Sequence, residues 1–262
     1  MTPEHPSDPE PRTLQLPDGP MVYTDEGDGP ALLLVHGYPG GPRDYRWLAP
    51  ALPGFRVIRI QLPGMGGTPL STGPATSVTG RAELVVQACD VLGLQDFGLV
   101  GHSMGGGIAI CAAAALGPRV RALVLLASIG VRPHHSLRRW NPKPWAWLLG
   151  TFMRPVLVPM VVKGFSAAGF PPVWDEPALL HTLDCAAGID FDGIEAALGS
   201  IAVPTLLAWA EDDPHVEPAI GAELVARLPE GPRLSWPTGG HNIQKSHAVE
   251  IGAAIAAMLE AR

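Results

Sequence analysis

The 262-residue sequence predicts an α/β protein built on a doubly wound, mostly parallel sheet. Short apolar runs rich in Val, Ile and Leu alternate with stretches of helical spacing, a pattern typical of βα units around a buried sheet. Apolar residues make up 47% of the chain and charged residues only 16%, so a large core can be buried and little disorder is expected. A chain of this length accommodates one such core with an inserted segment.

Seven strands are expected, each as a short apolar run between turn-forming residues. In chain order they are residues 21–25, 31–35, 56–60, 97–100, 122–126, 205–209 and 233–236. Helical spacing between these runs predicts four core helices, at residues 76–92, 104–116, 218–228 and 247–259. The alternation of strands and helices is what predicts the doubly wound order.

The alternation stops between residues 131 and 200, a stretch without a clear strand and too long for a plain loop in a compact domain. We therefore expect a core of residues 1–130 and 201–262 with a helical lid at residues 131–200. The lid is rich in large apolar side chains that can roof a pocket at the carboxyl edge of the sheet or pack the lid onto the core. They are Trp140, Trp145, Trp147, Phe152, Met153, Met160, Phe165, Phe170 and Trp174, with the first three taken as candidate substrate-binding residues.

Charge and targeting signals narrow the class of partner. The formal net charge of −7 and pI near 5.7 argue against a protein that holds the phosphates of nucleic acids. The N-terminus is polar and proline-rich without an apolar signal region, so a cytoplasmic location is expected. The most apolar stretch, residues 144–162, contains an arginine and interior prolines, so it predicts part of the lid and no membrane partner. A small-molecule substrate fits these properties, and the oligomeric state is left open.

No cofactor or metal is expected. The three cysteines, Cys89, Cys111 and Cys185, have no CxxC spacing and are interpreted as core thiols. The histidines outside the candidate site show no HxxxH or carboxylate pairing of metal-ligand type. A dinucleotide fingerprint fails because Pro69 stands where glycine is required, and no phosphate loop is present.

The segment Gly101-His102-Ser103-Met104-Gly105 joins a predicted strand to an alanine-rich predicted helix, the context of a nucleophile elbow. A sharp strand-to-helix turn strains the serine backbone, and a Cβ at either flanking position would clash. Ser103 is thereby exposed at a helix N-terminus, where free N–H groups favour developing negative charge. A glycine-rich helix start that merely packs closely is the structural alternative.

A second loop, His36-Gly37-Tyr38-Pro39-Gly40, follows the strand at residues 31–35 and can supply a further backbone donor. The N–H groups of Tyr38 and Met104 are the expected oxyanion hole. His36 is expected to brace this loop by a side-chain hydrogen bond.

Together these segments resemble the α/β-hydrolase family, in particular its serine esterase-like branch with an HGxP oxyanion loop and a GHSMG elbow. The turn at residues 63–68 is similar to the family's PGxGxS turn, with Gln61 and Thr68 in place of the usual Asp and Ser. The loops at residues 210–216 and 239–242 resemble its acid and histidine loops. The resemblance covers nearly the whole chain and implies His241 as general base and Asp213 as its carboxylate partner.

Asp212 is the alternative acid, since it follows the same predicted strand. The spacing of the family's acid loop fits Ala210, Asp213 and Val216, whereas Asp212 would shift the frame by one residue. Pro214 restricts the backbone of Asp213 to extended geometry, which helps to aim its carboxylate. Asp212 is then expected to be a solvated or loop-bracing acid.

Ester cleavage by a carboxylesterase or lactonase, through an acyl-enzyme on Ser103, is the predicted reaction because a serine, histidine and aspartate with two backbone donors suffice for it. The same scaffold also hosts carbon–carbon bond hydrolases, cofactor-free perhydrolases, aminopeptidases and non-catalytic binding proteins. Tyr38 and Asn242 depart from what iminopeptidases and ring-cleavage hydrolases have at these positions. Dehalogenases and epoxide hydrolases share the HGxP loop but use an aspartate nucleophile where this chain has Ser103.

Overall fold

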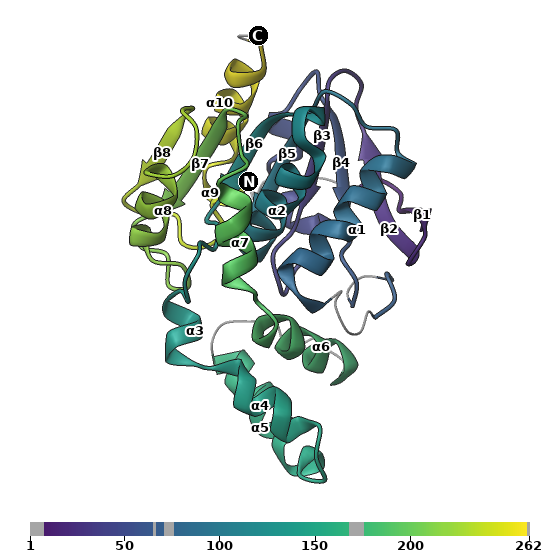
Figure 1. The fold of residues 1–262 in the computed structure, drawn as a ribbon, viewed down its shortest axis with the longest axis vertical. Helices are drawn as coiled ribbons and strands as arrows, with labels where there is room; N and C mark the ends of the chain where they lie inside the picture. Colours follow the sequence, from purple (N-terminus) through teal and green to yellow (C-terminus); the bar gives the residue numbers. More distant parts are fainter. Residues whose placement is uncertain (1–7, 65–66, 71–75, 168–175, 261–262) are drawn as a thin grey trace, which may run out of the picture.

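The computed structural model describes residues 8–64, 67–70, 76–167 and 176–260. The core is an eight-stranded sheet with the order β1-β2-β4-β3-β5-β6-β7-β8. Strand β2 pairs antiparallel with both β1 and β4. All the other neighbouring pairs, from β4–β3 to β7–β8, are parallel. Figure 1 shows the sheet in the upper part of the molecule, with helices packed against it and a helical extension below. The predicted doubly wound α/β class is confirmed.

All seven predicted strands are present, and β3, β4 and β8 have the predicted bounds. The strands are β1 (Arg12–Leu16), β2 (Gly19–Glu26), β3 (Ala31–Val35), β4 (Arg56–Ile60), β5 (Phe97–His102), β6 (Val120–Leu126), β7 (Thr205–Ala210) and β8 (Arg233–Trp236). The edge strand β1 was not predicted: only Leu14 and Leu16 of its five residues are buried.

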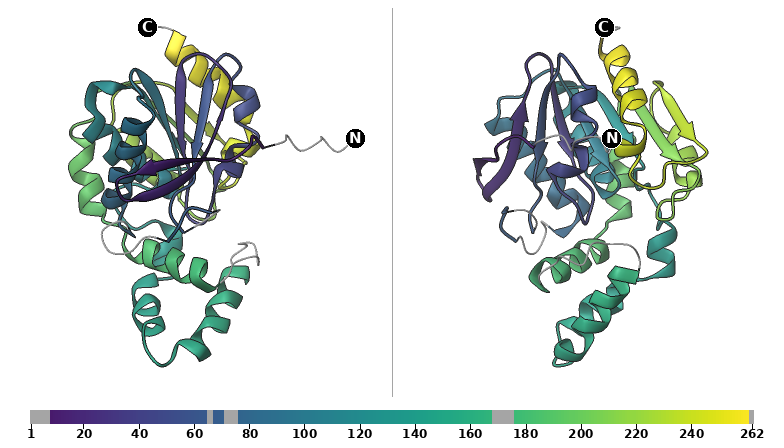
Figure 2. Two further views of the ribbon diagram at one scale, coloured as in Figure 1. Left: turned by 90° about the vertical axis from the view of Figure 1, so that its right-hand side faces the viewer. Right: turned by 180° about the vertical axis from the view of Figure 1, so that it is seen from behind.

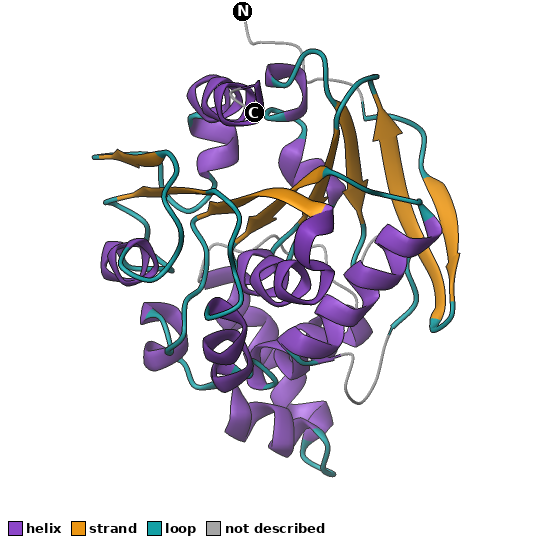
Figure 3. Ribbon diagram, turned by 45° about the horizontal axis from the view of Figure 1, so that its top comes forward, coloured by secondary structure: helices purple, strands orange, loops and turns teal. Residues whose placement is uncertain are grey.

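Helices cover both faces of the sheet (Figure 3). One apolar cluster joins the sheet to α1 (Val78–Val91), α2 (Met104–Leu116) and α8 (Pro218–Val225). The other face packs on α10 (Ala248–Glu260), which follows the short α9 (Ile243–Ser246). Central strands buried on both faces explain why they read as unbroken apolar runs.

In the described part of the predicted insertion the chain forms five helices: α3 (His135–Arg139), α4 (Pro142–Leu149), α5 (Arg154–Ala167), α6 (Glu176–Ala187) and α7 (Phe191–Leu198). Helices α3, α4 and α5 extend away from the sheet in both views of Figure 2, and α6 lies between them and the core. It has its own small core of Leu149, Leu157, Val161, Leu179 and Leu183. Helices α6 and α7 also reach the main core: Cys185 of α6 and Ile194 and Leu198 of α7 belong to the main core cluster, and α7 packs on α2.

Within the described ranges, no helix has the length and apolar character needed to cross a membrane. The longest helix of the insertion, α5, has 14 residues and contains Pro159. Phe165, Phe170 and Trp174 of the predicted lid lie outside the described side chains, as do Met65 and Gly66 of the turn after β4.

Candidate active site

The turn between β5 and α2 has the strained backbone that the sequence predicts for an elbow. Ser103 has φ 56° and ψ −123°, a region that residues with a Cβ rarely adopt. A Cβ on Gly101 would lie 2.3 Å from the backbone oxygen of Gly105, and one on Gly105 would lie 2.2 Å from that of Val35. Glycine is therefore required on both sides of the serine, because any side chain there would clash with backbone oxygen atoms.

The structure brings the three predicted side chains together at the carboxyl edge of the sheet. Ser103 follows β5, Asp213 lies three positions after the end of β7, and His241 lies five positions after the end of β8. The hydroxyl of Ser103 lies 2.9 Å from Nε2 of His241, and Nδ1 of His241 lies 2.8 Å from Oδ2 of Asp213. With Nδ1 protonated and donating to the carboxylate, Nε2 accepts from the hydroxyl, which is the orientation that a general base requires.

Asp213 is held as a carboxylate although its side chain is fully buried. Burial alone would raise its pKa, but His241 and the N–H groups of His215 and Val216 lower the pKa overall, below the usual value. The two N–H groups donate to Oδ1 at 2.8 and 3.0 Å, which leaves Oδ2 for the histidine. Asp212 instead accepts from Gly240 N at 2.8 Å and braces the histidine loop.

The loop after β3 lies against the elbow. A Cβ added to Gly37 would lie 2.8 Å from the Cβ of Ser103, so the backbone of this loop lies directly against the serine. Met104 is the first residue of α2, and the first N–H groups of a helix have no acceptor within it. This arrangement is compatible with the predicted pair of oxyanion donors, Tyr38 and Met104.

His36 braces the loop after β3, as the sequence predicts. Its Nδ1 donates to Gly37 O at 2.6 Å and its Nε2 accepts from Leu62 N at 2.9 Å. Burial lowers the pKa of His36 to about 4, so the ring is neutral in the folded protein. Gln61 and Thr68, the two departures from the family turn, are both hydrogen-bonded: Gln61 contacts the His36 ring, and Thr68 donates to Gln61 O at 2.9 Å.

His102 is a positioning residue that the sequence analysis missed. Its Nε2 donates to the backbone oxygen of His241 at 2.9 Å, and the two ring centroids lie 4.9 Å apart. Burial lowers the pKa of His102 to about 3, so a neutral ring supports the histidine loop. Adjacency to Ser103 gave no signal of this role, because the partner is a backbone atom 139 residues away in the chain.

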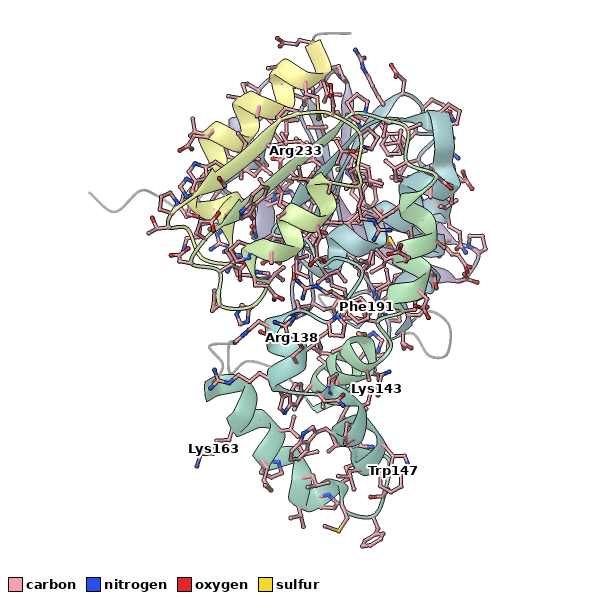
Figure 4. All side chains as sticks on the ribbon, turned by 60° about the vertical axis from the view of Figure 1, so that its left-hand side comes forward. Arg138, Lys143, Trp147, Lys163, Phe191 and Arg233 are labelled. Carbon is pink, nitrogen blue, oxygen red and sulfur yellow. The ribbon has the colours of Figure 1, made fainter. Side chains whose placement is uncertain are left out.

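The three tryptophans taken as substrate-binding residues do not gather at the site. Trp140 and Trp145 are half-buried against the small core of the insertion. Trp147 is 71% exposed and lies on the part of the insertion farthest from the sheet, as Figure 4 shows. Its assignment as a pocket residue is wrong: positions two apart on a helix point in nearly opposite directions, so Trp145 and Trp147 cannot share a face.

A sheet of this order, with a serine elbow and an aspartate–histidine pair at its carboxyl edge, defines a hydrolase class. Residues 30–179 match the family model described as the alpha/beta hydrolase fold, and the chain belongs to that family.

Relatives with different activities resemble most of the chain. It is 26% identical to a pyrrolizixenacetamide deacetylase from Xenorhabdus hominickii, over 87% of this chain and 90% of the relative. It is also 26% identical to a 2-hydroxy-6-oxo-6-phenylhexa-2,4-dienoate hydrolase from Burkholderia cepacia, over 86% and 85% of the two chains. The crystal structure of haloalkane dehalogenase DbeA from Bradyrhizobium elkani has a TM-score of 0.77 and 20% identity, covering 96% of this chain and 98% of that one. Such a likeness shows the fold, and the reaction has to be argued from the site.

Proposed function

We propose that the protein is a serine hydrolase that cleaves a carboxylic ester through an acyl-enzyme on Ser103. The observation that carries the proposal is the pair of contacts of His241, 2.9 Å to the serine hydroxyl and 2.8 Å to the carboxylate of Asp213. An activated serine hydroxyl next to an oriented imidazole is what acyl transfer requires.

In the proposed reaction, His241 takes the proton of Ser103 as the oxygen attacks the ester carbonyl carbon. The carbonyl oxygen becomes an oxyanion, which the N–H groups of Tyr38 and Met104 stabilise. The intermediate collapses, the carbon–oxygen bond to the alcohol breaks, and His241 gives its proton to the leaving alkoxide. Water then attacks the acyl-enzyme with His241 again as base, and release of the acid restores Ser103. Asp213 stabilises the imidazolium form of His241 in both halves.

The identity of the nucleophile supports ester cleavage over dehalogenation, because the dehalogenases that resemble this chain use an aspartate where it has Ser103. The Xenorhabdus relative is named as a deacetylase, an activity that also transfers an acyl group. Carbon–carbon bond hydrolysis is the second candidate, since the Burkholderia relative is named for such a substrate.

A substrate panel tests the proposal. p-Nitrophenyl esters from acetate to decanoate, lactones, aminoacyl amides and a 2-hydroxy-6-oxo-dienoate are offered to the wild-type protein and to Ser103→Ala. We expect turnover of at least one ester, together with fluorophosphonate labelling of Ser103. Ser103→Ala should lose several orders of magnitude in kcat, because only binding and the oxyanion donors remain.

Ser128→Ala is the matched control, because Ser128 is also buried but donates to the backbone oxygen of Ile129. It should keep both labelling and turnover. Labelling without turnover of any compound would favour a binding protein of this fold, and preferential turnover of the dienoate would favour the second candidate. If Ser103→Ala kept more than about a tenth of the wild-type kcat, Ser103 would not be the nucleophile.

A further inference from the structure

The outer surface of the helical insertion exposes an unusual group of large apolar side chains. Phe152 is 91% exposed, Trp147 71% and Val156 62%, and the neighbouring Met153 and Met160 are exposed as well. These five residues, from α4, α5 and the loop between them, are called the apolar tip. Val162, also on α5, is exposed as well, and the other large exposed apolar side chains in the described part of the chain are scattered singly over the core: Leu70, Val91 and Val249. A contiguous apolar surface of this kind marks an interaction site.

The apolar tip is separate from the surface that holds the insertion together. The opposite sides of α4 and α5 bury Leu149, Leu157 and Val161 against α6. The hairpin of α4 and α5 therefore already has a packed interior, and the apolar tip is a second apolar surface. Figures 1 and 4 show this hairpin projecting from the end of the molecule farthest from α10. A partner that covers the apolar tip must therefore be a separate molecule or surface, because the core of this chain lies at the other end of the molecule.

The insertion that carries the apolar tip is positively charged, on a protein that is acidic as a whole. Residues 132–163 contain six Lys and Arg and no Asp or Glu, although the chain has a net charge of −7. Arg132 and Arg138 form ion pairs with glutamates of the core. The exposed side chains of Arg139, Lys143 and Lys163 have no carboxylate partner among the residues that the structure describes. The insertion thus combines exposed aromatic rings at its tip with positively charged side chains farther back along its helices.

The cations are set back from the tip along the helices. Lys143 lies one helical turn before Trp147, and about 9 Å before the end of α4 at 1.5 Å per residue. Lys163 lies towards the other end of α5, and Figure 4 shows Lys143 nearer to the core than Trp147 and Lys163 on the opposite side of the hairpin. Helices that lie on membranes bury aromatic residues about 5–10 Å into the boundary between headgroups and acyl chains, with Lys and Arg nearer the water.

We propose that the apolar tip docks onto the surface of an anionic lipid bilayer. Trp147 and Phe152 enter the boundary between headgroups and acyl chains, and Lys143 and Lys163 face the lipid phosphates. Charge complementarity selects this occupant: the positive charge of Arg139, Lys143 and Lys163 favours an anionic surface, and it disfavours a second copy of the same positively charged insertion. The docked protein lies on the membrane and does not span it. The proposal does not depend on the reaction at Ser103.

Vesicle co-sedimentation tests the proposal with the full chain. Vesicles of phosphatidylcholine alone are compared with vesicles of equal parts phosphatidylcholine and phosphatidylglycerol. We expect binding to the mixed vesicles to be at least about tenfold tighter, and to weaken at high salt as screening increases. The double variant Trp147→Ser, Phe152→Ser should lose binding to the mixed vesicles by about tenfold or more. Val249→Ser is the matched control, because Val249 is 73% exposed but lies on α10, and it should bind as the wild type does.

Two further measurements separate the apolar and the charged contributions. Tryptophan emission should shift to shorter wavelength on binding, and Trp147→Phe should abolish most of that shift while keeping binding. Lys143→Gln with Lys163→Gln should weaken binding to the mixed vesicles only. Circular dichroism and thermal unfolding verify that each variant is folded.

Three results would overturn the proposal. The first is no binding to the mixed vesicles, or equal binding to both kinds of vesicle. The second is binding that the tip variants and Val249→Ser affect alike. The third is self-association in sedimentation velocity that the tip variants abolish, without vesicle binding, which would assign the apolar tip to a second copy of the chain.

Discussion

Replacing Asp213 by Asn probes the geometry of the site most sharply, because the two side chains have nearly the same size but offer different groups to His241. In the wild-type protein, Oδ1 accepts from two backbone N–H groups at 2.8 and 3.0 Å, and Oδ2 accepts from Nδ1 of the histidine. An Asn can keep the two backbone bonds only with its carbonyl oxygen. Its amide NH₂ group then faces the ring and donates to Nδ1.

This exchange forces the wrong tautomer on His241. With Nδ1 accepting, the proton moves to Nε2, which then cannot accept from the hydroxyl of Ser103, 2.9 Å away. We expect kcat to fall by about 10⁴, as in other serine hydrolases with this change, or roughly 5.5 kcal/mol at 1.36 kcal/mol per tenfold. The fold should remain intact, because the buried backbone donors keep their acceptor.

Asp212→Asn is the control for the same substitution one residue earlier. Asp212 accepts from Gly240 N through one oxygen, and the carbonyl of Asn can replace it. Its kcat should change by less than about threefold, since no charge at the imidazole is altered. Both variants are assayed with the ester that the wild type turns over best, beside circular dichroism. A larger loss in Asp212→Asn, or more than about a tenth of wild-type kcat in Asp213→Asn, would refute the assignment of the acid.

Three further outcomes follow from the same contacts. Gly105→Ala should unfold the elbow or lower the thermal midpoint, because its Cβ meets a backbone oxygen at 2.2 Å, whereas Gly164→Ala, with nothing within 4 Å, should be tolerated. Folding lowers the pKa values of His36 and His102 to about 4 and about 3. Below about pH 6.5 the unfolded state therefore binds more protons, and the free energy of unfolding should decrease as the pH is lowered. Urea midpoints at pH 7 and pH 5 measure this, and equal midpoints would contradict it. Glu217→Gln should speed amide exchange in α3, because it weakens the ion pairs of Glu217 with Arg138 on α3 and with Arg132 before it; a change of unfolding free energy above about 1 kcal/mol would be unexpected for such partly exposed pairs.

The parts of the fold that the sequence predicts are those with strong local patterns. The central strands are unbroken apolar runs because both of their faces are covered, and so β3 and β4 were placed to the residue. The edge strand β1 could not be recognised, since its RTLQL sequence is half exposed and depends on pairing with β2. The same limit applies to α7, because whether a helix packs on the core or on the insertion is a tertiary property.

At the site, the sequence predicts residues that a motif fixes in the chain, and it misses those that act through space. Ser103, Asp213 and His241 follow from loops at the ends of three strands, and the structure places them in contact. His102 supports the histidine loop through a backbone oxygen, for which no spacing rule exists. Trp147 was misplaced because aromatic content alone does not define which way a helix face points.

The order in which the chain supplies the site has a consequence for biogenesis. Ser103 and its strained turn lie in the first half of the sequence, whereas Asp213 and His241 come after β7 and β8, the last strands to be added to the sheet. During synthesis from the N-terminus, the nucleophile exists long before its base does. A nascent chain that stops before residue 233 lacks His241 and leaves β7 without its partner strand β8. The proposed activity therefore requires the last strand of the sheet to be in place, which would make turnover a reporter of a completed sheet.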